Sequence, residues 1–228
     1  MTGAVIGVVG GSGGVGASTF AAALAHAAPT GVLLDLDPVG GGMDVLLGAE
    51  HQPGARWSDV RVGGGYLDPG LLADQLPRWG QVPVLALDGA PPQPDDAVQV
   101  LAACAELGVV AVDLGRAPSA LRAAVLEPCA VVVLVARAEV APLAAAHAVL
   151  MGIDASVGAV LRPGRVPTEQ AAHLVGAEPF GRLPDVPAAM RGGRISRRIC
   201  RVAAGVLDGA AQVGAARGGQ AVSDARSR

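Results

Sequence analysis

Six short apolar segments recur along the chain and set its fold class. They are rich in Val or Leu and show no alternation of polar and apolar residues, at 4–9, 31–36, 83–87, 109–112, 130–136 and 156–161. Strands covered on both faces in a parallel sheet have this pattern. Ala-rich stretches that suit helices lie between several of them, at 18–28, 95–107, 117–126, 140–151 and 168–175. The alternation predicts an α/β fold, with a doubly wound, mostly parallel sheet flanked by helices.

Length and composition indicate one domain with a substantial core. The chain has 228 residues, of which 51% are hydrophobic and 16% charged. A domain usually takes roughly 100–200 residues. We expect the domain to span 1–213, with a last helix at 194–213, and the polar, Gly-rich stretch 214–228 to be a disordered tail. Residues 50–80 are predicted to form a long surface excursion with one short helix at 69–76.

Charge and cysteine content disfavour several classes of protein. With a net charge of −3, the chain lacks the excess of cations that a non-specific nucleic-acid binder needs, so nucleic acid is disfavoured as a partner. Three widely separated cysteines fit neither a disulfide framework nor a paired metal site. No secretory signal is recognisable, and no apolar run reaches the ~18 residues of a membrane span. We therefore expect a cytoplasmic protein.

A run rich in glycine follows the first apolar segment and precedes an Ala-rich stretch. Residues 10–16, here called the glycine loop, read GGSGGVG and are followed by Ala17, Ser18 and Thr19. In the pattern G-x-x-x-x-G-K-[ST], Gly11, Gly16 and Ser18 match, whereas the Lys position holds Ala17. Such loops direct backbone N–H groups at phosphate oxygens, beside a helix N-terminus. All 17 cations of the chain are Arg, so Ala17 removes the charge itself.

These residues alone leave an alternative open, because a chain with 33 glycines can contain a Gly-rich turn of no function. Three aspartates favour the phosphate site. Asp35 lies near the end of the second apolar segment, Asp37 directly follows that segment, and Asp113 directly follows the fourth. Ligands of open α/β sheets bind at the carboxyl edge of the strands, where these side chains are expected. Asp113 after an apolar strand is typical of a carboxylate that holds Mg²⁺ through water.

Residues 11–19 (GSGGVGAST), 35–38 (DLDP) and 113–115 (DLG) together resemble the MinD/ParA branch of P-loop ATPases, whose loop reads KGGVGKT. Both lysines of that motif are replaced, by Ser12 and Ala17. The variant GGVGAST is similar to the CpaE/TadZ subgroup, which is linked to Flp/Tad pilus assembly and includes actinobacterial septum-site-determining (Ssd-type) proteins. Segments 76–88, 131–140 and 161–164 also resemble this subgroup. The resemblance spans about 4–210, and we expect the chain to be the ATPase core without the N-terminal receiver-like domain of fuller members.

The resemblance implies that the chain binds ATP or ADP with Mg²⁺. Ser18 would bind Mg²⁺ directly and Asp113 through water, while Asp37 would orient the attacking water, with Asp35 beside it. The base would lie near the loops after the late strands. The implied nucleotide-binding residues are Gly11, Ser12, Gly13, Gly14, Val15, Gly16, Ala17, Ser18, Thr19, Arg162 and Pro184.

The resemblance further implies a spatial-regulation or assembly factor that acts in pilus localisation or septum-site determination. It would form a homodimer and bind a secretion or pilus ATPase or division-machinery proteins, through which it could reach the plasma membrane, cell pole or septum. Since both lysines are replaced, we expect weak or absent ATP hydrolysis. Three hypotheses stay open: a binding module without turnover, a slow ATPase switch and, least favoured, a DNA-partitioning ATPase.

Overall fold

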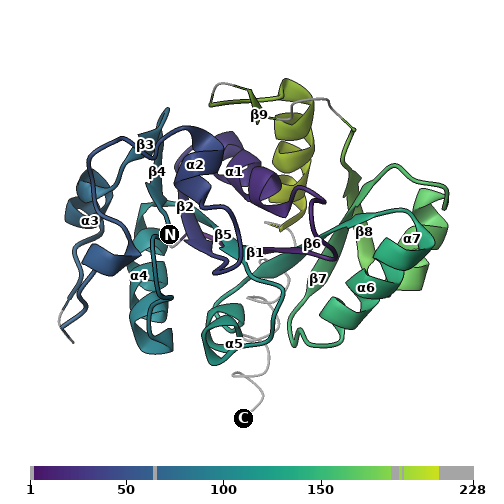
Figure 1. The fold of residues 1–228 in the computed structure, drawn as a ribbon, viewed down its shortest axis with the longest axis horizontal. Helices are drawn as coiled ribbons and strands as arrows, with labels where there is room; N and C mark the ends of the chain where they lie inside the picture. Colours follow the sequence, from purple (N-terminus) through teal and green to yellow (C-terminus); the bar gives the residue numbers. More distant parts are fainter. Residues whose placement is uncertain (1–2, 64–65, 186–189, 192, 211–228) are drawn as a thin grey trace, which may run out of the picture.

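The computed structural model describes residues 3–63, 66–185, 190–191 and 193–210, which fold around one eight-stranded sheet (Figure 1). The strand order is β3-β4-β2-β5-β1-β6-β7-β8. All pairs are parallel except β3 with β4. The strands are β1 (Val5–Gly10), β2 (Gly31–Leu36), β3 (Arg78–Trp79), β4 (Val82–Leu85), β5 (Val109–Leu114), β6 (Val131–Arg137), β7 (Val157–Arg162) and β8 (Glu178–Arg182). The predicted fold class is confirmed, and each of the six apolar segments overlaps a strand.

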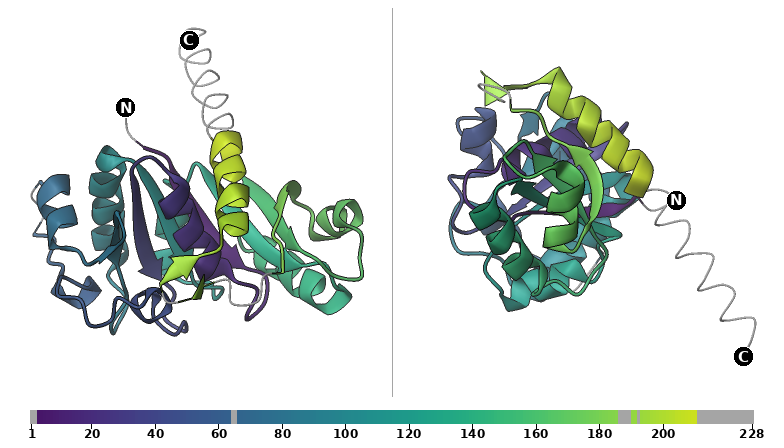
Figure 2. Two further views of the ribbon diagram at one scale, coloured as in Figure 1. Left: turned by 90° about the horizontal axis from the view of Figure 1, so that it is seen from above. Right: turned by 90° about the vertical axis from the view of Figure 1, so that its right-hand side faces the viewer.

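Helices cover both faces of the sheet, because successive strand residues point to opposite sides. On one face, Ile6 and Val8 of β1 pack with α1 (Ala17–Ala27), α2 (Met43–Leu47) and the helix at 197–210. On the other face, Val5 and Val9 belong to the core formed with the remaining helices. These are α3 (Pro69–Gln75), α4 (Pro94–Leu107), α5 (Ala120–Leu126), α6 (Val140–Leu150) and α7 (Thr168–Val175). Figure 2 shows the helix at 197–210, drawn in yellow-green, beside the purple α1.

The segment 50–80 is attached to the core more firmly than a surface excursion would be. Trp57, in the short 3₁₀ helix η1 (Trp57–Asp59), is buried, and its Nε1 donates to the Asp35 carbonyl at 2.8 Å. Arg56 is also buried and pairs with Asp44 of α2, with Nε and Oδ2 3.2 Å apart. The predicted helix in this segment is present as α3. Two large side chains therefore tie the segment to the end of β2 and to α2.

Several short elements were not expected from the sequence. These are α2, η1, β3, β8 and the hairpin of β9 (Met190–Arg191) with β10 (Arg194–Ile195). The predicted last helix is described only at 197–210, and the expected domain end at 213 and tail at 214–228 lie outside the described residues. None of the helices within the described ranges is long and apolar enough to cross a membrane.

Candidate functional site

The glycine loop joins the end of β1 to the start of α1. The Gly11 N–H donates to the Val135 carbonyl of β6 at 2.8 Å, which fixes the loop to the centre of the sheet. Gly14 and Gly16 have φ of 69° and 89°, a left-handed backbone that favours glycine. Gly16 is the N-cap of α1 and accepts from the Phe20 N–H at 2.9 Å. The first N–H groups of a helix have no partner within it, so those of α1 are available at the loop.

The glycines of the loop have two different roles. A Cβ on Gly11 would lie 2.5 Å from the Ala146 Cβ of α6, so Gly11 is required for close packing of the loop on α6. A Cβ on Gly14 would meet nothing within 4 Å, and one on Gly13 only the tip of Arg116. The side of the loop at Gly13 and Gly14 is therefore open, as a phosphate-binding backbone must be.

A cavity of about 1010 Å³ lies in front of this open side. It is bordered by the loop and the start of α1, by the segment after β2 and by the segment after β5. The sequence-predicted residues that line it are Ser12, Gly13, Gly14, Val15, Gly16, Ala17, Ser18, Thr19, Asp35, Asp37 and Asp113. The volume is at the upper end of the roughly 300–1,000 Å³ typical of small-molecule sites, enough for a nucleotide. Of the residues predicted from sequence, Gly11, Arg162 and Pro184 are not in this lining.

Asp113 ends β5 beside Asp35 of β2, since the two residues are paired in the sheet register. The Asp113 side chain is 3% exposed and accepts a hydrogen bond from the Ser18 side chain. Burial, with smaller contributions from the charges of Asp35 and Asp37, raises the pKa of Asp113 to about 7. A bound divalent cation would stabilise the charged form of Asp113. The Asp113 carboxylate and the Ser18 hydroxyl are oxygen ligands of the kind that Mg²⁺ prefers. The residues present therefore fit a magnesium site.

The two aspartates that end β2 are in different environments. Asp35 is buried and accepts three backbone N–H groups, from Met43 at 3.0 Å, Asp37 at 3.1 Å and Leu87 at 3.4 Å. Burial raises its pKa, although these hydrogen bonds act in the opposite direction. Asp35 thus holds the segment after β2 in place.

Asp37 has fewer partners and faces the cavity. Its Oδ1 accepts from the Val39 N–H at 3.1 Å, and its side chain is half-buried. A Cβ on Gly115 would lie 3.2 Å from both Asp37 Oδ1 and Pro38 Cδ, so Gly115 permits the segments after β2 and β5 to approach closely. Between the two aspartates, Asp37 is better placed to act on a bound molecule.

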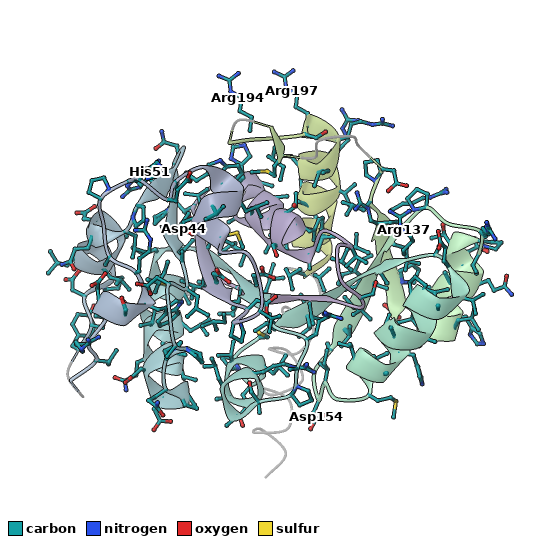
Figure 3. All side chains as sticks on the ribbon, viewed as in Figure 1. Asp44, His51, Arg137, Asp154, Arg194 and Arg197 are labelled. Atoms are coloured by element: carbon teal, nitrogen blue, oxygen red, sulfur yellow. The ribbon has the colours of Figure 1, made fainter. Side chains whose placement is uncertain are left out.

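The ends of β6 and β7 form an ion-pair cluster of Arg137, Arg162 and Asp185. Arg137, labelled in Figure 3, donates from Nη1 and Nη2 to the two carboxylate oxygens of Asp185, each at 3.2 Å. Arg162 Nε lies 3.2 Å from Asp185 Oδ1, at ion-pair distance but without hydrogen-bond geometry. Its Nη1 donates to the Val15 carbonyl at 3.2 Å. Arg162 therefore supports the glycine loop from outside the cavity, and its role toward the base stays a prediction.

Two arginines that the sequence did not single out line the cavity. Arg116 follows Gly115 after β5, and Arg122 lies in α5. Arg122 is 5% exposed and donates to the carbonyls of Arg116 and Gly152, the latter at 3.0 Å. The only signal for Arg116 is its place directly after Asp113, Leu114 and Gly115, where a cation would adjoin the predicted metal site. No periodicity or motif predicts Arg122 here.

Solved structures of ParA-type and MinD-type proteins share this fold. A ParA family ATPase from Chlorobium tepidum superposes with a TM-score of 0.72 over 92% of this chain and 98% of its own, at 19% identity. MinD of the MinC:MinD cell division complex of Aquifex aeolicus gives 0.62 over 92% and 95%, at 18% identity. A putative plasmid partition protein from Borrelia burgdorferi bound to AMPPNP gives 0.64 over 91% and 98%, at 11% identity. The chain has the fold of MinD/ParA-type P-loop ATPases.

Sequence relatives add less about function. Two uncharacterized proteins from Mycobacterium tuberculosis strains are 38% identical to the chain over 190 residues. The match covers 77% of this chain and 53% of each relative, so the chain spans about half the length of the curated relatives it matches. No model of a known protein family matches the sequence.

Proposed function

We propose that the chain is a spatial-regulation or assembly factor that binds ATP or ADP with Mg²⁺ and hydrolyses ATP weakly or not at all. The observation that carries this proposal is the glycine loop, open at Gly13 and Gly14, on a cavity that also receives Asp37 and Asp113. Backbone N–H groups of the loop would bind the phosphates, and Ser18 and Asp113 would hold the metal. The bound metal would neutralise phosphate charge.

Slow or absent turnover is proposed because the glycine loop carries no cation. Ser12 and Ala17 stand where the similar ATPases have lysines, and neither side chain can stabilise charge that develops on a transferred phosphoryl group. A slow ATPase switch is the second candidate, since Asp37 lines the cavity and is free to orient a water molecule. Measurement of phosphate release with wild type and Asp37→Ala separates the two. Turnover that is lost in the variant would favour the switch.

The site of action proposed is the Flp/Tad pilus or the division septum. The support is the resemblance of GGVGAST and of segments 76–88, 131–140 and 161–164 to the CpaE/TadZ and Ssd-type subgroup. The Aquifex MinD is found in a complex with MinC, which favours action through protein partners. The homodimer is proposed from the resemblance to MinD/ParA-type ATPases. A secretion or pilus ATPase, or division proteins, would then recruit the chain to the membrane, pole or septum. Pull-down from native cells tests this, and recovery of neither class would count against it.

The first experiment is calorimetric titration of the purified protein with ATP and ADP in the presence of Mg²⁺. Gly16→Arg is the control, because it forces a side chain into a left-handed backbone at the start of α1, where a Cβ already lies 3.5 Å from Arg162 Nη1. We expect micromolar binding to wild type and none to the variant. No binding to wild type would reduce the glycine loop to a structural element and make the chain a scaffold.

A DNA-partitioning ATPase is the least favoured function, although one similar structure is a putative plasmid partition protein. The net charge of −3 argues against the counterion release that drives non-specific DNA binding. Measurement of DNA affinity over a range of salt concentrations tests this alternative. Affinity that falls steeply with salt would support it.

A further inference from the structure

A cation from another part of the chain faces the open side of the glycine loop. The Arg116 Nη2 atom lies 4.0 Å from the position that a Cβ on Gly13 would occupy. Arg116 is exposed, lines the cavity and makes no ion pair with any residue that the structure describes. An arginine on a protein surface commonly meets a carboxylate, so an unpaired guanidinium at the mouth of a cavity is available for an anionic ligand.

The backbone that carries Arg116 is held from below by Arg122. The buried Arg122 guanidinium donates to the Arg116 carbonyl and to the Gly152 carbonyl, which ties the segment after β5 to the end of α6. The Ser119 hydroxyl also accepts from the Arg122 N–H at 3.0 Å and begins α5. The position of the Arg116 backbone is therefore fixed, while its side chain is free to move toward a ligand.

The acidic groups around the cavity favour such a cation. Asp35, Asp37 and Asp113 all border it, and a nucleotide would add phosphate charge to the same space. One Mg²⁺ offsets two of these charges, and the glycine loop offers only backbone dipoles. Arg122 is engaged with two carbonyls. Arg116 is thus the exposed cation of the cavity lining that can meet a terminal phosphate.

We propose that Arg116 is the phosphate-binding cation of this chain and replaces, from the segment after β5, the charge that Ser12 and Ala17 do not supply. The proposal rests on the proposed function, because it assigns a residue to the polyphosphate of the same nucleotide. A guanidinium can bind two phosphate oxygens at once through its planar fork of N–H donors. Arg116 then distinguishes nucleotides by the number of their phosphates, and it contributes most for ATP and least for AMP.

The test compares Arg116→Ala, Arg116→Lys and wild type by calorimetric titration with ATP, ADP and AMP in the presence of Mg²⁺. Loss of a charge-assisted hydrogen-bonded pair should weaken ATP binding about tenfold or more in Arg116→Ala. The loss should be smaller for ADP, near zero for AMP, and partly restored in Arg116→Lys. Arg201→Ala, an exposed arginine of the helix at 197–210, is the matched control and should bind as wild type does. Equal melting temperatures without nucleotide would show that the variants fold.

The outcomes separate this inference from the proposed function. If wild type binds no nucleotide, both fail. If wild type binds ATP and Arg116→Ala binds it equally well, the assignment of Arg116 is wrong while the nucleotide site stands. A loss of ATP affinity seen only at concentrations where sedimentation shows dimers would also overturn the proposal, since Arg116 would then bind the partner's nucleotide. A loss that is equal for ATP and AMP would overturn the role in phosphate binding.

Discussion

The two halves of the carboxyl edge of the sheet carry opposite charges and differ in how these are compensated. On one side of β1, the neighbouring strands β5 and β2 end in Asp113 and Asp35, which are paired in register and lie at the cavity. On the other side, β6 and β7 end in Arg137 and Arg162, also paired in register. These arginines converge on Asp185, and neither lines the cavity.

The two halves differ in whether their charged side chains have partners of opposite charge. In the ion-pair cluster, two cations share one carboxylate near solvent, so their charges are largely satisfied. At the cavity, Asp113 is buried with a hydroxyl partner and two neighbouring carboxylates, which is unfavourable without a ligand. Uncompensated charge in a cleft is a sign of a functional site. We therefore propose that the β2 and β5 side binds the ligand and that the β6 and β7 side supports it.

The largest expected effect concerns the pH dependence of stability and Asp113. In the folded protein the Asp113 carboxyl group keeps its proton up to about pH 7, whereas a carboxyl group with the ordinary pKa of 3.8 loses its proton at a much lower pH. The folded state therefore binds more protons in this window, and stability should fall as the pH rises from about 4 to 7. The total loss should be on the order of 4 kcal/mol, at about 1.4 kcal/mol per pKa unit.

Urea denaturation at several pH values checks this. In Asp113→Asn most of the loss should disappear, and a smaller slope from Asp35, whose pKa is also raised, should persist. Addition of Mg²⁺ at pH 8 should stabilise wild type more than the variant. If Asp113→Asn left the pH dependence of the free energy of unfolding unchanged, Asp113 would not be its source. The main electrostatic contrast between the two halves would then be wrong.

The second prediction separates Asp35 from Asp37. Asp35→Ala leaves three backbone N–H groups without their acceptor and should lower the free energy of unfolding by about 2–3 kcal/mol. Asp37→Ala removes a single exposed contact to Val39 and should cost less than about 1 kcal/mol, yet abolish any phosphate release. Urea unfolding at pH 7 and a phosphate-release assay measure the two quantities. If Asp37→Ala is the more destabilising change, the structural role assigned to Asp35 is wrong.

Much of the β2 and β5 side could be predicted from the sequence because its signals are local. The glycine loop, Asp35, Asp37 and Asp113 each lie at the carboxyl end of an apolar strand, and parallel strands bring these ends to one edge. The structure places these three aspartates and residues 12–19 at one cavity. The same reasoning does not explain why residue 11 must be glycine. That requirement comes from its contact with α6, which is far away in the sequence.

The β6 and β7 side was harder to predict in full, because its outermost strand, β8, lacks the apolar pattern that reveals β6 and β7. β8 reads EPFGR, with exposed Glu178, Pro179 and Arg182, so it has neither a continuous apolar run nor clear alternation. Its strand pairing depends on Gly158 of β7, where a Cβ would lie 2.3 Å from the Phe180 ring. The contact of Arg122 with Gly152 also joins residues 30 positions apart. Such contacts arise from tertiary packing and leave no local sequence signal.

The third prediction tests the boundary between the halves, where the glycine loop packs on α6. In Gly11→Ala the new Cβ would lie 2.5 Å from the Ala146 Cβ, and overpacking of this kind costs about 1–3 kcal/mol. Gly13→Ala is the matched control, since its Cβ would approach only Arg116 Nη2 at 4.0 Å, and it should stay within about 0.5 kcal/mol of wild type. Thermal unfolding of both variants measures the difference. If the two variants were equally destabilised, the contact of Gly11 with α6 would not be the reason that residue 11 is glycine.

The smallest expected effect lies in the ion-pair cluster. Asp185 is half exposed, so the bridges it makes to Arg137 and Arg162 are partly screened by solvent, and Asp185→Ala should lower the free energy of unfolding by about 1 kcal/mol. Arg162 would keep its contact to the Val15 carbonyl, so the glycine loop should hold its shape and ATP affinity should change less than about twofold. Calorimetry of Asp185→Ala beside Arg137→Ala measures this directly. A large loss of ATP affinity with an unchanged affinity for inorganic triphosphate would show that this half contacts the base. The roles predicted for Arg162 and Pro184 would then be supported, and the division between a binding half and a supporting half would be wrong.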